Sequence, residues 1–287
     1  MISRRGVLAG FAGLGALSLS ACANRPSTMT ADGSGGNIAP SLPAAPAIDP
    51  HAHLDAVIDV SHSTTVYDFS HVRNHSNILA VLHKASEGGD WRDPLYAERR
   101  DKALAAGLLW GAYHFGTHQY SGADQAQAFL AMAQPAPDTL MALDLELNER
   151  IPANTMTIDQ AEAFVTVIKA STGRLPLLYT HAIWAEGKPV GRQGRSLGGA
   201  ISSRSILAEC DLWLADYRSQ PQLPSAWSGK GWRLWQYAGE GAKAISPPGS
   251  PGRSVAGVDR CDRNVFLGDA TALVRYWCHD GGRRTIS

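Results

Sequence analysis

The chain has 287 residues, of which 44% are hydrophobic and 18% are charged, as in ordinary globular proteins. A single β/α barrel reaches this size and buries a sizeable core. Basic and acidic residues both number 26, so charge alone would not gather nucleic acid or an anionic membrane. We therefore expect no nucleic-acid partner, and a polymer substrate that is not strongly acidic fits the composition better. We also expect a monomer.

The first residues, 1–21, are typical of an export signal. A twin-arginine pair precedes a small apolar run that is too short and too rich in glycine for a secure membrane span. Leu-Ser-Ala then leads into Cys22, which resembles a bacterial lipoprotein signal and makes Cys22 the lipid-bearing first residue of the mature chain. The alternative is an ordinary cleaved signal with an incidental cysteine. We expect a lipid anchor on the periplasmic side of an envelope membrane. The lipoprotein resemblance implies the outer membrane, because Ala23 follows the cysteine.

Residues 22–50 are rich in Ala, Pro, Ser and Gly, which predicts a disordered tether. Export to an oxidising compartment permits one disulfide among Cys210, Cys261 and Cys278, although the spacing does not say which two would pair. No CxxC pair is present, so a structural zinc site is not expected, and we predict neither a metal nor a cofactor.

Apolar, β-rich runs alternate with helical patterns after the tether. The strand candidates are 55–61, 78–87, 108–115, 139–146, 175–181, 211–217 and 232–238. Near-continuous apolar runs are typical of strands buried on both faces, as in a parallel sheet or a barrel. The glycine-rich segment 186–203 lacks the GK[ST] ending of a phosphate-binding loop and is interpreted as a surface excursion.

Helices are predicted between these strands, at 94–106, 122–133 and 158–172. For the first, Asp93 stands in the cap position, Pro94 in the first turn and Gly107 at the end, in agreement with the start and stop rules. For the third, Thr157 and Gln160 form a capping-box pattern.

Polar residues gather where the predicted strands end. They are Asp59, Ser61, Lys84, Glu87, Tyr113, His114, Asp144, Glu146, Tyr179, His181, Asp216, Tyr217 and Gln236. Any one of them could be an ordinary satisfied strand-end group. Because β/α barrels carry their sites at the carboxyl ends of the strands, the set together predicts one catalytic mouth.

Asp144 and Glu146 are two positions apart, so both would face the mouth, displaced along the strand by roughly 6.6 Å. Two carboxyl groups on one face are the minimum equipment for glycoside cleavage, because like charges raise one pKa and keep one group protonated. The spacing does not decide between retention and inversion of the anomeric centre. A lone DxE could also hold a divalent cation or pair with arginine.

Several segments resemble, in the same order, the lysozymes of glycoside hydrolase family 25. They are "IDVSH" (58–62), "YDFSHV" (67–72), "KASEGGDWRDPLYAERRDKALAAGLLWGAYHF" (84–115), "LDLE" (143–146), "LWLADY" (212–217), "LWQY" (234–237) and "CDRNVFLGD" (261–269). The resemblance implies an α/β fold, an irregular TIM-like barrel of five β/α units followed by three strands, within a catalytic domain of residues 51–287. It also implies cleavage of the β-1,4 bond between N-acetylmuramic acid and N-acetylglucosamine in peptidoglycan glycan strands.

The resemblance further implies roles for single residues. Glu146 matches the general acid/base, Asp144 the neighbouring carboxylate that stabilises charge or orients the substrate acetamido group, and Asp59 and Asp262 the two further acidic positions. Retention with acetamido assistance is favoured by the same resemblance. The residues expected to bind substrate are Tyr113, His114, Tyr179, Asp216, Trp235, Tyr237 and Glu87, although Trp235 could equally belong to the core.

At two places the match to the family is not straightforward. The chain has Thr64-Thr65 where the family usually has Asn/Gln-Gly, which leaves the conformation of the first loop open. Near the end of the chain, Asp262 rather than Asp259 stands in a D-x-N-x-F-x-G spacing. In a strand that begins there, Asp262 and Asn264 would share a face, and the residues between and after them would face away.

Two other readings of the sequence remain. His51 and His53, with Asp49, resemble the metal-binding opening of amidohydrolase barrels, which would make the protein a metal-dependent hydrolase. They follow a Pro/Ala-rich tether rather than a long buried strand, which speaks against this reading. The other alternative is a wall-binding lipoprotein that has lost catalysis, and the intact set of acidic residues speaks against it.

Overall fold

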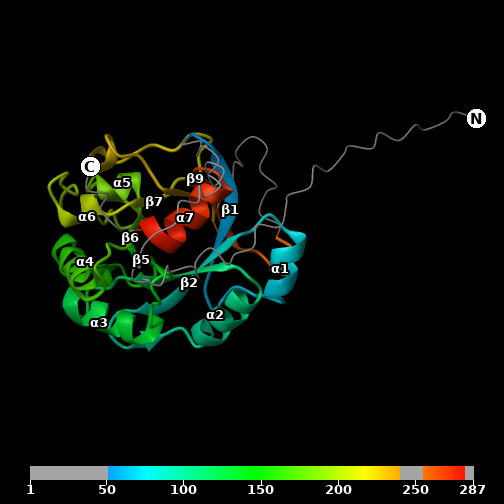
Figure 1. Ribbon diagram of the computed structural model, residues 1–287. Coiled ribbons are helices and arrows are strands. Elements are labelled where there is room, and N and C mark those ends of the chain that lie inside the picture. Colours follow the sequence, from blue (N-terminus) through cyan, green and yellow to red (C-terminus); the bar gives the residue numbers. More distant parts are fainter. Residues whose placement is uncertain (1–50, 240–254, 282–287) are drawn as a thin grey trace, which may run out of the picture. The chain divides into compact units, whose positions relative to one another are not determined.

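The computed structural model describes residues 51–239 and 255–281 (Figure 1). The predicted signal at 1–21 and the whole predicted tether at 22–50 lie outside these ranges. The predicted lipid-bearing residue, Cys22, therefore lies outside them as well. Within the described part of the chain, no helix combines the length and the apolar character that a membrane crossing requires.

Eight strands of the described residues close into a barrel. Their order around it is β1, β9, β8, β7, β6, β5, β4, β2, and β2 pairs with β1 again. Neighbours are parallel, except that β9 runs antiparallel to both β8 and β1. The strands are β1 His53–Val60, β2 Ala80–Glu87, β4 Leu109–Phe115, β5 Leu140–Asp144, β6 Leu177–His181, β7 Leu212–Ala215, β8 Leu234–Ala238 and β9 Asp262–Leu267. A further short strand, β3 Trp91–Arg92, pairs with β2 outside the ring.

Helices follow each of the first five barrel strands and become short along the chain, as Figure 1 shows. They are α1 Phe69–His75, α2 Tyr96–Ala105, α3 Gly122–Ala133, α4 Ile158–Thr172, α5 Ala182–Ala185, α6 Ile206–Glu209 and α7 Ala270–Arg275, with 3-10 turns η2 Pro152–Asn154 and η3 Ser225–Trp227 and a π-helical turn η4 Tyr276–Asp280. Strands β7, β8 and β9 follow without a long helix between them. The predicted irregular barrel of five β/α units and three strands is therefore confirmed.

Helix α4 begins and ends as its sequence predicts. Thr157 accepts a hydrogen bond from the backbone of Gln160, whose side chain returns to the Thr157 backbone, so the capping box is complete. Gly173 ends the helix at φ 70°, a left-handed conformation that glycine adopts without strain. Ala161, Phe164, Val165 and Ile168, which share one face of the helix, are buried.

Helix α2 starts later than predicted. It begins at Tyr96, and the residue in the cap position, Leu95, makes no side-chain capping bond. Asp93 does not cap the helix from the expected place because its carboxylate serves two segments. One oxygen accepts the Leu95 N–H at 3.0 Å and the other accepts the His62 N–H at 2.8 Å. Asp93 thus ties the loop after β1 to the entry of α2.

The loop after β1 is a tight turn that needs no glycine. The Thr64 N–H donates to Ser61 O at 3.0 Å. Arg99 of α2 donates to Ser61 O and to Thr64 O, both at 2.7 Å. Among the described residues other than glycine, only Gln134 has a positive φ. Thr64-Thr65 is therefore compatible with an ordered loop, which a buried arginine holds in place.

Cys210 is a buried thiol outside any disulfide. Neither of the two possible disulfides that would include Cys210 is therefore formed.

Candidate active site at the carboxyl end of the barrel

A cleft of about 650 Å³ opens at the carboxyl ends of the parallel strands. Segment 146–151 after β5 forms one part of its lining, and His181 at the end of β6 and Ile183 beyond it form another. Tyr217 and Asp262 also line it, because β9 runs antiparallel and starts at the end where its neighbours finish. The cleft lies on the face where the strand-end polar residues predicted a catalytic mouth.

Asp144 and Glu146 differ in their access to this cleft. Asp144 is the last residue of β5 and is 8% exposed, whereas Glu146 follows the strand, lines the cleft and has a side chain 27% exposed. Among the described residues, one oxygen of Asp144 is buried without a hydrogen-bond partner. Glu146 is therefore the carboxyl group that can touch a ligand in the cleft, and Asp144 is a buried neighbour.

Burial governs the protonation of the deeper carboxyl groups. It raises the pKa of Asp144 well above its ordinary value, the charge of Glu146 adds to the rise, and Lys84 opposes it. Burial also raises the pKa of Asp59 to about 6, although hydrogen bonds from two side-chain amides lower it. The charge of Glu146 acts on Asp59 as well. These carboxyl groups from β1 and β5 therefore form one electrostatically coupled site.

A hydrogen-bond network fixes the Asp59 carboxylate. Gln236 Nε2 donates to its two oxygens at 3.1 and 3.0 Å, and Asn264 Nδ2 donates to Oδ2 at 2.8 Å. The hydroxyls of Tyr179 and Tyr217 both donate to Gln236 Oε1 at 2.9 Å. Because the amide oxygen of Gln236 already accepts from two tyrosines, its NH₂ group must face Asp59.

Strand β9 has the side-chain orientation that the sequence predicts. Asp262 lines the cleft, and Asn264 is fully buried on the same face, where it reaches Asp59. Arg263 faces away and pairs with Asp55 of β1 at 3.0 Å. Asp259 is exposed and lies in a bend before the strand. The choice of Asp262 over Asp259 therefore agrees with the placement of both residues.

Two of the predicted substrate-binding residues line the cleft, and a third packs inside the barrel. Tyr179 and Glu87 line the cleft, and Glu87 also accepts an ion pair from Lys84 at 2.6 Å. Tyr113 packs edge-on against Trp213, with ring centroids 6.0 Å apart. Burial and then the charges of Asp59, Asp144 and Asp262 raise the pKa of Tyr113 well above its ordinary value.

His114 does not line the cleft, and this prediction is wrong. It is fully buried on the outer face of β4, stacked on Phe164 of α4 at 4.9 Å and hydrogen-bonded to Ser86 at 2.9 Å. Adjacent residues of a strand face opposite sides, so Tyr113 and His114 could not both point into the mouth. Burial lowers the pKa of His114 to about 3, which keeps the imidazole neutral.

Trp235 and Tyr237 are also misplaced by the sequence analysis. They flank Gln236, which points into the barrel, so both rings lie on the outer face, 3% and 0% exposed. Trp235 Nε1 donates to Asp216 O, and the Tyr237 hydroxyl donates to Asp55 at 2.7 Å. Trp235 is therefore a core residue, which was the alternative considered for it, and Tyr237 is a core residue too.

Asp216 is not among the residues that line the cleft. Strand β7 ends at Ala215, and the Asp216 carboxylate accepts hydrogen bonds from Arg218 and from the Gln222 N–H at 2.8 Å. Burial alone would raise the pKa of Asp216, but these hydrogen bonds lower it overall. Its role is to hold the loop after β7, and the next residue, Tyr217, reaches the cleft instead.

Residues that the sequence analysis did not assign to the site belong to it. His181 Nε2 lies 3.1 Å from Glu146 Oε2, and Tyr217, Gln236 and Asn264 complete the network around Asp59. The sequence indicated His181, Tyr217 and Gln236 as strand-end polar residues and Asn264 as part of the D-x-N-x-F-x-G motif, but it did not list them among the site residues. What the sequence lacked was a reason to prefer them over their neighbours.

The amidohydrolase reading is not supported by the position of its histidines. His53 is the first residue of β1 and lies against the Trp232 ring, with centroids 5.3 Å apart. Six residues of strand, roughly 20 Å, separate it from Asp59 at the other end of β1. The described residues contain no group of three or more His, Cys, Asp and Glu that could hold a metal ion.

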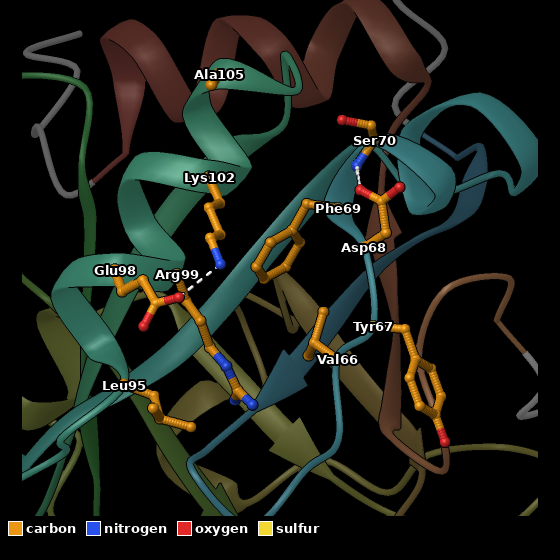
Figure 2. A pocket seen from close by; sticks show the side chains of 10 residues that line it. All are labelled: Val66, Tyr67, Asp68, Phe69, Ser70, Leu95, Glu98, Arg99, Lys102 and Ala105. Atoms are coloured by element: carbon orange, nitrogen blue, oxygen red, sulfur yellow. Dashed lines mark hydrogen bonds and ion pairs between the residues drawn. The ribbon is translucent and has the colours of Figure 1, made fainter.

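A second hollow, of about 500 Å³, lies between α1 and α2 (Figure 2). Its charged groups already have partners. Arg99 binds the loop after β1, Lys102 pairs with Glu98 at 2.5 Å, and Asp68 accepts the Ser70 N–H at 2.8 Å. None of the strand-end carboxyl groups lines this hollow, so we do not assign it to the reaction.

The closed β/α barrel presents an accessible glutamate, nearby aspartates and aromatic rings at one cleft. This arrangement is typical of a glycoside hydrolase. Comparison with known families agrees with this class. The chain belongs to glycosyl hydrolase family 25, whose model matches residues 58–244.

Individual relatives are similar over most of the chain. Lysozyme M1 of Streptomyces globisporus is 28% identical over 232 residues, which are 76% of this chain and 69% of that protein. The crystal structure of a lysozyme from Streptomyces coelicolor is 29% identical with a TM-score of 0.60, over 76% of this chain and 94% of the other. A family GH25 lysozyme from Aspergillus fumigatus is 25% identical with a TM-score of 0.58, over 78% and 98%.

Proposed function

We propose that the protein is a lysozyme, an N-acetylmuramidase that cleaves the β-1,4 bond between N-acetylmuramic acid and N-acetylglucosamine in peptidoglycan. The observation that carries this proposal is the pair of carboxyl groups at the end of β5, with Glu146 in the cleft and Asp144 buried beside it. The similar proteins that are named lysozymes support the choice of substrate.

Glu146 acts as the general acid and base. It donates a proton to the leaving glycosidic oxygen, and it later takes a proton from the attacking water. His181 lies at hydrogen-bond distance from Glu146, and in its neutral form it donates an N–H to the carboxylate and holds the carboxylate toward the cleft. His181 is thus a positioning residue.

Asp144 supports the substrate acetamido group. The acetamido oxygen attacks the anomeric carbon as the protonated leaving group departs, which gives a cyclic intermediate with positive charge on its nitrogen. Water, deprotonated by Glu146, then attacks the anomeric carbon and releases the acetamido oxygen. The two inversions leave the product with its original anomeric configuration. A buried carboxyl group next to this nitrogen accepts its N–H, and the developing charge favours the ionised carboxylate. Asp59 and Asp262 flank the same sugar, with Asp59 held by Gln236 and Asn264.

We also propose a location for the enzyme. Residues 22–50 would tether the catalytic domain, residues 51–287, to an envelope membrane through a lipid on Cys22, facing the periplasm. As a monomer on such a tether, the enzyme would reach peptidoglycan strands near that membrane.

The test is product analysis on purified peptidoglycan. We expect muropeptides with new reducing ends at N-acetylmuramic acid, observed by mass spectrometry, and activity that persists in a metal chelator. Products with only anhydro ends, or only peptide cleavage, would contradict the proposal. Activity that is lost in chelator and restored by zinc would instead revive the metal-hydrolase reading.

The catalytic assignment is tested by Glu146→Gln, which removes the proton donor and leaves the volume almost unchanged. Turnover should fall roughly 100-fold to 10,000-fold, with thermal unfolding and binding to peptidoglycan kept. Glu98→Gln makes the same change on α2, outside the cleft, and serves as the control, with turnover near that of the wild type. A wild-type protein that binds peptidoglycan without turnover would favour the wall-binding alternative.

A further inference from the structure

The glycine-rich excursion after β6 carries an unbalanced positive charge. Between Glu186 and Glu209 the chain has no acidic residue, and its basic residues are Lys188, Arg192, Arg195 and Arg204. Arg192 and Arg195 sit in a short hairpin, residues 190–195, which we call the basic hairpin. The whole chain is electrically balanced, so this local excess is a feature of the excursion itself.

The basic hairpin has a defined backbone. The Val190 N–H donates to Arg195 O at 2.7 Å, and the Arg195 N–H donates to Val190 O at 3.0 Å. Gly191 and Gly194 supply the positive φ values, 69° and 60°, that the turn requires. At the base of the excursion, a Cβ on Gly187 would collide with the Gly199 backbone, so the two ends of the excursion lie in close contact. The arginines are therefore carried on an ordered support.

The hairpin stands at the edge of the catalytic cleft. Val190 and Gly191 line the cleft, and Gly191 lies so close to Leu147 on the β5 side that a Cβ would come within 2.7 Å of it. Arg192 and Arg195 are exposed, and neither forms an ion pair with any residue of the described ranges. Two guanidinium groups that have no ion-pair partner within residues 51–239 and 255–281 thus lie next to the cleft.

Acidic groups surround the reacting position instead. Glu146 and Asp262 line the cleft, and the buried Asp59 and Asp144 interact electrostatically with Glu146, so an anionic ligand group is disfavoured there. An uncharged sugar backbone fits the cleft. Carboxylates attached to that backbone would be attracted by the arginines at the edge of the cleft. This separation of charge suits a substrate made of a neutral chain with acidic branches.

We propose that the basic hairpin binds the carboxylates of the stem peptides that branch from the glycan, so that Arg192 and Arg195 favour substrate that still carries its stems. This inference rests on the proposed function. Stem peptides leave the sugar chain through the lactyl group of N-acetylmuramic acid and so extend from the cleft toward its rim. Guanidinium groups bind carboxylates through paired, charge-assisted hydrogen bonds, which matches this branch chemistry.

The experiment compares two forms of the same substrate. Purified peptidoglycan is used intact and after an amidase has removed the stem peptides, and kcat/KM is measured on each. Arg192→Gln/Arg195→Gln should lower the ratio of intact to stripped kcat/KM by about three- to tenfold, the effect of losing two exposed ion pairs. Arg73→Gln/Lys102→Gln removes the same charge from α1 and α2 and should leave the ratio at the wild-type value. Raising the salt concentration should reduce the wild-type ratio, because the contacts are exposed.

An equal loss on both substrates, or no change on either, would overturn the proposal. Cosedimentation with Glu146→Gln proteins measures binding without turnover. Arg192→Gln/Arg195→Gln in this background should bind intact peptidoglycan less well than Glu146→Gln alone. On stripped glycan the two proteins should bind equally. If the wild type cleaves neither substrate, the proposed function fails, and this binding comparison still tests the hairpin. Loss of binding to phosphatidylglycerol vesicles, with the peptidoglycan ratio unchanged, would assign the arginines to a membrane instead and overturn the proposal.

Discussion

At the scale of single residues, competing effects set the pKa of the buried carboxyl groups beneath the cleft. Asp59 loses hydration by burial, which favours its neutral form, whereas donors from Gln236 and Asn264 favour its charged form. Burial is the larger effect, so the pKa is raised to about 6. A group with this pKa changes its charge within the range of pH in which cell-wall enzymes can be assayed.

The first prediction is a change in the pH dependence of stability. Between its ordinary pKa of 3.8 and about 6, Asp59 holds a proton in the folded state that the unfolded chain releases. The folded state binds more protons there, so the contribution of Asp59 to the free energy of unfolding falls as the pH rises. Relative to Asp59→Asn, the wild type should lose roughly 1 to 3 kcal/mol between about pH 4 and pH 7.

Urea unfolding of both proteins at several pH values measures this difference. The control is Asp259→Asn, an exposed aspartate, for which the difference from the wild type should stay flat across the same range. A wild type that gains stability over Asp59→Asn with rising pH would show that Asp59 is ionised more easily in the fold than in the unfolded chain.

The second prediction ranks two aspartates that are three positions apart. Asp262 lines the cleft and Asp259 is an exposed residue of the preceding bend. Asp262→Asn should lower turnover on peptidoglycan by at least about tenfold, or about 1.4 kcal/mol of transition-state stabilisation, and Asp259→Asn by less than about threefold. The initial rate of reducing-end release is the measurement. The reverse ranking would refute the role of Asp262.

At the scale of elements, α3 and α4 meet at a glycine. Gly122 begins α3, is buried, and lies against the Gln160 backbone of α4 so closely that a Cβ would collide with its carbonyl oxygen. The Gln160 side chain also donates to His118 O at 2.9 Å and to Tyr120 O at 2.7 Å. The start of α4 and the segment before α3 are therefore one packed unit.

The third prediction is that Gly122→Ala destabilises the protein by roughly 1 to 3 kcal/mol, because overpacking outweighs the helix propensity gained. Gly229→Ala is the matched control, since a Cβ there meets nothing within 4 Å and the residue does not have a positive φ. It should change the free energy of unfolding by less than about 0.5 kcal/mol. Chemical denaturation of the two variants distinguishes them, and equal stability would mean that α3 and α4 can move apart at no cost.

At the scale of the whole molecule, barrel closure assembles the site. Asp59 comes from β1, Asp144 from β5 and Asp262 from β9, and these strands come together only when β9 pairs with both β8 and β1. The interactions that hold Asp59 span up to 205 positions in sequence. Loss of the last strand would therefore remove catalysis together with the fold.

The fourth prediction concerns the proposed anchor. Cys22→Ser should move the protein from the membrane fraction to the soluble periplasmic fraction, because the lipid would be missing. Activity on peptidoglycan should persist, since the described cleft is built from residues 51–281. Fractionation with an antibody to the protein and a peptidoglycan assay on each fraction are the measurements. Unchanged membrane fractionation would contradict the anchor.

Much of this fold is determined locally and could be predicted from the sequence. The apolar runs indicate the first seven barrel strands, because buried strands need continuous apolar faces. Thr157, Gln160 and Gly173 mark the ends of α4, because caps act within a few residues. The order of the motifs identified the family, and the i, i+2 spacing correctly placed Asp262 and Asn264 on one face of β9.

Only the tertiary structure decided which side chain of each strand end faces the cleft. His114, Trp235 and Tyr237 have the chemistry of sugar-binding residues, yet each lies one position from the residue that points inward. A shift of one residue reverses the face of a strand, and the strand start, its bulges and the packing on its outer face select between the two. The raised pKa values of Asp59 and Asp144 likewise come from burial by distant segments, which no local pattern encodes.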